Sequence, residues 1–183
     1  MNQPRYDLVT RFFNLVESRQ CDVVNGVSKF QHCYETAERA RLDGRDNQYV
    51  FCALMHDALG GLAPDNHGVA IASLLSPWVD DKHGRLLCYH DIFQFDNWEK
   101  DAGRISKTLA RDYLLEERSI DLDDYDFIAE FVDLYDHPAF NDIKIPLDWR
   151  VIYTPIFNNV LKGYDVSRNY YNFVTNVSKR SQR

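Results

Sequence analysis

Apolar residues recur at helical spacing along most of the chain, and the short alternating runs typical of strands are scarce. Glycine, proline and serine residues separate the apolar segments, and Ser28 is well suited to cap one of them. Pro146 fits the first turn of a late helix, which Pro155 should kink. The chain is therefore predicted to be all-α, with its other helices over residues 6–18, 28–42, 47–59, 66–75, 84–95, 102–116, 122–135 and 166–177.

Length and composition predict one globular domain, residues 1–183, with a basic tail over 178–183 that is expected to fray. Hydrophobic residues make up 45% of the chain and charged residues 27%, which is a normal balance for a globular protein. The net charge of −7 argues against nucleic acid or an anionic membrane as a partner, because both need a cationic surface. A small-molecule substrate is the favoured partner, and the oligomeric state stays open.

Location and redox state also follow from sequence features. No apolar run reaches the roughly 18 to 20 residues that cross a bilayer, and the N-terminus lacks the apolar region of a secretory signal. A cytoplasmic location is therefore expected. The four cysteines form no CxxC pair, and Cys33, Cys52 and Cys88 occur in apolar helical patterns. They are expected to be buried, reduced thiols.

The sharpest chemical signal is the adjacent pair His56 and Asp57, which interrupts the apolar segment predicted over 47–59 near its end. Burial of two ionisable groups is costly unless something compensates them. A divalent cation does so, because neutral imidazole and carboxylate are both metal ligands. In isolation, such a pair is more often a helix cap or a surface pair.

Three further histidines lie on predicted helices that a bundle would bring together. His32 occurs on the preceding helix, His67 opens the following one, and His90 lies in an apolar stretch beyond it. Each of them alone would more often be an ordinary core or surface histidine, but the ordered set predicts one interior metal site. His83 and His137 neighbour Gly84 and Pro138 in predicted turns and are interpreted as bystanders.

This order of ligands resembles the HD-domain superfamily, in which a His on one helix, a His-Asp pair on the next, further His residues and a distal Asp bind metal. The resemblance covers about residues 28–162 and implies a single-domain HD-type helical bundle. The motif His-x-x-x-Thr-Ala-Glu at His32 and the motif Tyr-His-x-x-Phe at His90 are similar to those of the phosphonate-cleaving HD oxygenases and myo-inositol oxygenase. Those enzymes activate O₂ at a mixed-valent di-iron centre.

The resemblance implies two metal ions, most simply Fe(II)/Fe(III), although manganese or another divalent metal suits the same ligands. Asp57 is the expected bridge, with His32 and the distal Asp beside His56 on one metal and His67 with His90 on the other. Asp57, His67 and His90 are accordingly the expected catalytic ligands. The distal ligand is predicted to be Asp148, on an apolar late helix, with Asp133 and Asp136 as rivals interpreted as solvated charges.

The expected activity is O₂-dependent oxygenation of a small polar or amphipathic metabolite. The alternatives are a two-metal phosphohydrolase acting on a nucleotide or phosphorylated metabolite, and a binding module with a degenerate site. Gln94 and Ile145 occupy the positions of a Lys and an Arg in the phosphonate-cleaving enzymes, and Ala58-Leu-Gly-Gly61 replaces the Lys of myo-inositol oxygenase, so neither substrate is expected. The predicted substrate contacts are Lys29, Tyr34, Tyr89, Gln94, Trp98 and Arg150.

Overall fold

The computed structural model describes residues 5–102 and 111–163, and most of this part is helical, as predicted. The elements run in the order α1 (Arg5–Glu17), η1 (Ser18–Cys21), β1 (Val23–Val24), β2 (Val27–Ser28), α2 (Lys29–Leu42), α3 (Asn47–Met55), α4 (His67–Leu75), α5 (Asp81–Ala102), η2 (Tyr113–Glu117), α7 (Leu122–Phe131), η3 (Val132–Asp136) and α8 (Trp149–Leu161). Here η1 is a 3-10 helix, whereas η2 and η3 are π-helical turns. The helix predicted over 166–177 and the tail at 178–183 lie outside the described residues, as does most of the helix predicted over 102–116.

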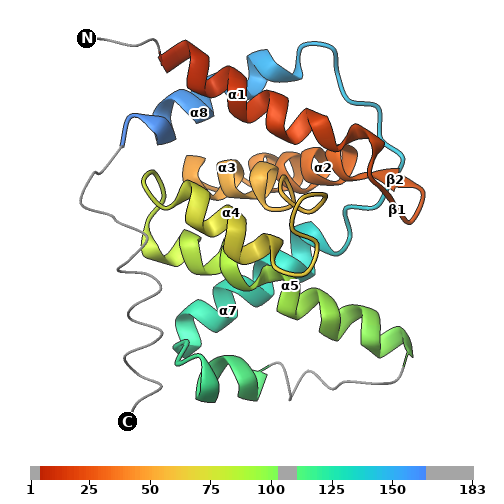
Figure 1. Ribbon diagram of the computed structural model, residues 1–183, viewed down its shortest axis with the longest axis vertical. Coiled ribbons are helices and arrows are strands. Elements are labelled where there is room, and N and C mark those ends of the chain that lie inside the picture. Colours follow the sequence, from red (N-terminus) through yellow and green to blue (C-terminus); the bar gives the residue numbers. More distant parts are fainter. Residues whose placement is uncertain (1–4, 103–110, 164–183) are drawn as a thin grey trace.

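The helices stack around one continuous hydrophobic core (Figure 1). Helices α1 and α8 lie side by side at one end, where the Phe13 and Phe157 rings are 4.6 Å apart between centroids. Helices α2 and α3 cross the middle, and α5 and α7 lie on the other side of them. The middle of this stack is therefore enclosed by protein on both sides.

Helix α3 is the central buried helix that its apolar sequence predicts. Every residue from Tyr49 to Met55 is at most 1% exposed, so this segment is in contact with protein all round. The helix ends at Met55, earlier than the residue 59 expected from the sequence, and His56 and Asp57 begin the turns that follow. The end of α3 therefore delivers both side chains into the interior.

A two-stranded hairpin before α2 was not predicted from the sequence. Strand β1 pairs antiparallel with β2, and the connecting Asn25 and Gly26 have φ values of 52° and 82°. Asn-Gly is favoured in such a two-residue turn, because both positions need positive φ. The hairpin leads into Ser28, which caps α2 in a reciprocal arrangement with Gln31, as expected for a capping residue.

Two other sequence expectations are settled within the described residues. Cys33, Cys52 and Cys88 are buried, as predicted, and Cys21, Cys33, Cys52 and Cys88 are all free thiols. No helix in residues 5–102 or 111–163 combines the length and apolar character needed to span a membrane. The cytoplasmic location stays a prediction.

Candidate metal centre

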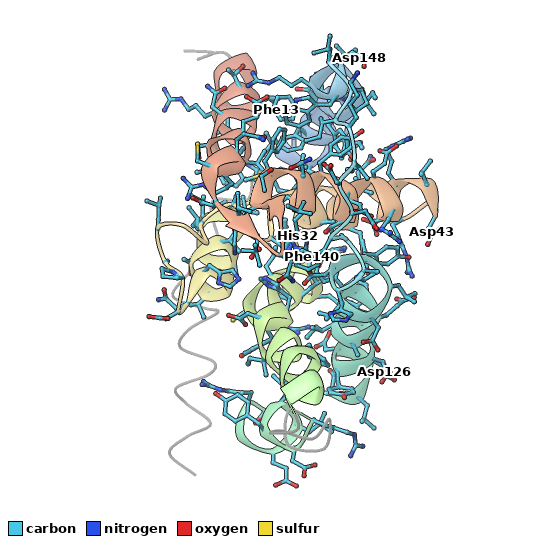
Figure 2. All side chains as sticks on the ribbon, turned by 90° about the vertical axis from the view of Figure 1, so that its right-hand side faces the viewer. Phe13, His32, Asp43, Asp126, Phe140 and Asp148 are labelled. Carbon is cyan, nitrogen blue, oxygen red and sulfur yellow. The ribbon has the colours of Figure 1, made fainter. Side chains whose placement is uncertain are left out.

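Six ionisable side chains from five segments of the chain meet in the interior of the stack. Four histidines and two aspartates take part, and all six residues are buried: His32 on α2, His56 and Asp57 after α3, His67 at the start of α4, His90 on α5, and Asp136 at the end of η3. Figure 2 shows His32 near the middle of the molecule, between its two ends. Such a concentration of buried ionisable groups requires mutual compensation or a bound ion.

The first half of this centre is formed by His32, His56 and Asp136. The Nε2 atoms of the two histidines are 3.1 Å apart. Asp136 Oδ1 lies 3.0 Å from His32 Nε2 and 3.4 Å from His56 Nε2. The three ligand atoms are thus close enough to hold one ion.

The second half of the centre is gathered around Asp57. Its Oδ1 lies 2.9 Å from His67 Nε2 and 3.7 Å from His90 Nε2. Its Oδ2 lies 3.9 Å from His32 Nε2, on the side of the first half. The carboxylate therefore presents one oxygen to each half, an arrangement that suits a bridging ligand. A second compact ligand group consists of His56, Asp57 and His90.

All four histidines use Nδ1 in the same way, which determines the atom that each offers to the centre. Each Nδ1 lies 2.8 to 3.2 Å from a backbone carbonyl oxygen, a contact that requires a proton on Nδ1. The acceptors are Ala53 for His56, Pro64 for His67, Leu87 for His90 and Ala139 for His32. Metal-binding histidines commonly have this second contact, because it leaves Nε2 free and correctly oriented.

The donor set fits a bound cation. With Nδ1 protonated, neutral His32 and His56 bring two Nε2 lone pairs within 3.1 Å of each other, and lone pairs repel unless a proton or a metal ion lies between them. Asp57 Oδ1, His67 Nε2 and His90 Nε2 are buried and make no hydrogen bond of acceptable geometry, although they lie close together. A divalent cation in each half would satisfy these atoms.

Protons on the histidines can also take part of this compensating role. Burial by itself lowers the pKa of His90, but the nearby carboxylates of Asp57 and Asp136 raise it to about 9. Burial likewise opposes ionisation of Asp136, yet the nearby His56 and His32 hold the pKa of that carboxyl well below its usual range. Both aspartates therefore supply negative charge at neutral pH, and bound metal must displace protons from the histidines.

The predicted distal carboxylate, Asp148, is wrong: Asp136 occupies that place in the structure. Asp148 is exposed at the N-terminal end of α8, next to Leu147, which is fully exposed. Figure 2 shows Asp148 at the upper end of the molecule, well away from His32. Asp136, interpreted from the sequence as a solvated charge, is instead fully buried in the first half of the centre. Asp133 is exposed, in agreement with its interpretation.

A periodic signal in the sequence distinguishes these aspartates. Ile128 and Val132 are buried at a spacing of four residues, and Asp136 continues that row by another four. On an α-helical period Asp133 would fall about 100° away from Val132, and in the structure it is exposed. Asp148 lacks such a row before it, because residues 146–148 are all exposed. The helical period, continued through η3, therefore identifies the inward carboxylate.

Of the predicted substrate contacts, the structure places Lys29 at the centre, with Nζ 2.9 Å from Asp57 Oδ2. Tyr34 packs against Trp149 and Tyr153 instead, because it lies two residues, or about 200°, from His32 on α2. Arg150 pairs with Glu17 on α1.

The remaining predicted substrate contacts lie on α5, as does one of the two histidines interpreted as bystanders. Tyr89 is buried beside Cys88, about 100° around α5 from His90, so it also departs from the expected role. Gln94 and Trp98 lie on α5, but their side chains lie outside the described part of the structure. His83, expected in a turn, instead lies on α5 and is buried against Asp80, whereas His137 is exposed. Neither histidine belongs to the two ligand groups, as expected for bystanders.

Residues 136–143, called the latch below, hold His32 in place. Phe140 stacks on the His32 ring at 4.4 Å between centroids, and the two side chains lie together in Figure 2. The latch is attached to α2 by Glu35, which accepts hydrogen bonds from Asn141 N at 3.0 Å and from Asn141 Nδ2 at 2.6 Å. His32 is the histidine whose carbonyl partner comes from a distant segment, whereas the other three partners lie three residues earlier.

Glu35→Gln is therefore expected to weaken metal binding in the first half of the centre alone. The amide would place a donor against Asn141 or Arg39 and loosen the latch, so the Ala139 carbonyl and Asp136 would lose their position. Changes in such supporting contacts cost about 10 to 100-fold in metal affinity. The measurement is a metal titration that resolves the two equivalents.

Glu38→Gln is the matched control, because Glu38 lies one turn further along α2 and bonds Arg41 and Tyr153 rather than the latch. Its two metal affinities should equal those of the wild type. Equal weakening of both equivalents in Glu35→Gln protein, or no weakening, would contradict the role assigned to the latch.

No protein-family model, curated protein or solved structure shows significant similarity to this chain.

Proposed function

We propose that this chain is a metal-dependent enzyme of the HD type, whose two-metal centre supports O₂-dependent oxygenation of a small metabolite. One observation carries the proposal: four buried histidines direct Nε2 inward around a carboxylate whose two oxygens point to different ligand groups. An ion pair that only stabilises the fold would not need four histidines whose Nε2 atoms all lie around one carboxylate. The assignment to an oxygenase rests on the resemblance of the motifs around His32 and His90, which also suggests iron.

The ligand types alone suit iron, manganese, zinc and cobalt. Bound iron would supply the redox chemistry that activates O₂, whereas other divalent ions on the same residues would supply Lewis-acid chemistry for hydrolysis. The contribution of the chain is orientation, because each imidazole is fixed through its carbonyl contact before metal arrives.

Aromatic side chains also exclude water from the centre. Phe131 packs edge-on against His56, at 5.7 Å between ring centroids, and lies 6.4 Å from the His90 ring. Phe140 stacks on the ring of His32, in the same half. A centre enclosed in this way limits access by solvent, which favours chemistry that must avoid side reactions with water.

Two-metal phosphohydrolysis is the second candidate, and a specific contact favours it. Lys29 lies beside Asp57, so the centre includes a cationic group of the kind that holds phosphoryl oxygens. The two activities make opposite demands on O₂, which allows them to be separated directly.

The test uses protein purified without added metal and then loaded with iron, manganese or cobalt. Reduced, iron-loaded protein should consume O₂ with at least one member of a panel of small metabolites, while phosphate release from phosphomonoesters stays slow. Both readouts are taken under air and under anaerobic conditions, with Asp57→Ala protein as the control lacking the bridge. Rapid phosphate release that does not depend on O₂ would reject the oxygenase and establish the hydrolase.

A further inference from the structure

The centre is more accessible on one side than on the other. The side chains of Lys29, His67 and Asp57 are 21%, 10% and 5% exposed. His32 is 2% exposed, and His56, His90 and Asp136 are fully buried. A molecule approaching the centre from solvent therefore meets Lys29 and His67 first.

Local structure holds the Lys29 ammonium group at this position. Lys29 is the first residue of α2, and its backbone N–H donates to Asp22 O across the hairpin at 2.6 Å. Its Nζ lies 2.9 Å from Asp57 Oδ2 on one side and packs against Gly60 on the other. A Cβ atom at position 60 would lie only 2.7 Å from Nζ, so the glycine leaves the room that the ammonium group occupies.

The charges at the centre do not balance once metal is bound. Asp57 and Asp136 supply two negative charges, and the four histidines are neutral when they bind metal through Nε2. Two divalent cations bring four positive charges, and Lys29 adds another. Excess positive charge in a buried site is costly, so the loaded centre should attract an anion.

We propose that Lys29 is a substrate-binding residue that holds an anionic group, a carboxylate or a phosphate, at the accessible side of the centre. The inference rests on the two-metal centre of the proposed function and assigns it a substrate class, small anionic metabolites. A lysine ammonium has three donors, so Lys29 retains its contact with Asp57 while it donates to the anion. Loss of this charge-assisted hydrogen bond sets the expected decrease in anion affinity when Lys29 is replaced.

The test measures anion binding rather than turnover. Full-length protein loaded with manganese is titrated calorimetrically with inorganic phosphate and with acetate, in the wild type and in Lys29→Met, Lys29→Arg and Lys162→Met variants. Lys162 is exposed at the end of α8 and serves as the matched control. Lys29→Met should retain both metals and bind the preferred anion about tenfold more weakly, or worse. Lys29→Arg should restore part of the affinity, and Lys162→Met should match the wild type.

The outcomes separate this inference from the proposed function. Unchanged anion affinity in Lys29→Met protein that holds both metals would refute the inference alone. Loss of metal from Lys29→Met would also refute it, because Lys29 would then serve Asp57 rather than the substrate. Failure of the wild type to take up metal would refute the proposed function and the inference with it. The anion bound more tightly by the wild type identifies the substrate group as phosphate or carboxylate.

Discussion

Asp57→Ala protein should lose both metal ions, whereas His90→Ala protein should lose only the ion of the second half. Asp57 directs Oδ1 toward His67 and His90 and Oδ2 toward His32, so its removal takes a ligand from each half. It also removes one of the two negative charges that compensate the cations, which is the more damaging loss in a buried site. The measurement is metal content per chain after loading and removal of free metal.

Thermal unfolding of both variants without metal serves as the control, since it separates a loss of ligands from a loss of fold. The stability control matters for Asp57→Ala in particular, because alanine at position 57 would leave the partly buried ammonium group of Lys29 without its Asp57 partner. Equal losses of metal in well-folded Asp57→Ala and His90→Ala proteins would mean that Asp57 binds a single ion.

Asp136→Asn protein is expected to lose the metal of the first half, and Asp148→Asn protein to retain both metals. Asp136 is fully buried, 3.0 Å from His32 Nε2 and 3.4 Å from His56 Nε2, whereas Asp148 is exposed. An amide has nearly the same shape as the carboxylate but removes its charge, so the effect should be on metal binding more than on packing. A titration that resolves two equivalents should show a loss of at least about 100-fold for one of them, larger than the effect of a supporting contact.

The Asp148→Asn variant tests the sequence prediction directly against the tertiary structure. Normal binding of both metals by Asp136→Asn protein would exclude Asp136 as a ligand. Loss of metal from Asp148→Asn protein would return the distal ligand to Asp148.

Most of the helices and the buried position of the His56–Asp57 pair were predictable from the sequence alone. The apolar positions of α3 leave no polar face, so its end had to lie inside the protein and bring His56 and Asp57 with it. Ser28 begins α2 through a local hydrogen bond that needs nothing from distant residues. Such features depend on neighbouring residues and on the helical period, which a sequence records directly.

The tertiary structure decided how distant segments complete the centre. Asp136 rather than Asp148 joins His32 because η3 packs beside α2, and Ala139 supplies the carbonyl for His32 across 107 residues. Lys29 reaches Asp57 only through the packing of α2 against the turn that contains Gly60. The sequence by itself thus determined which apolar segments form buried helices and that His56 and Asp57 lie at the end of one of them. Their partners across the core depended on how the helices pack, because several packings satisfy the same hydrophobic pattern.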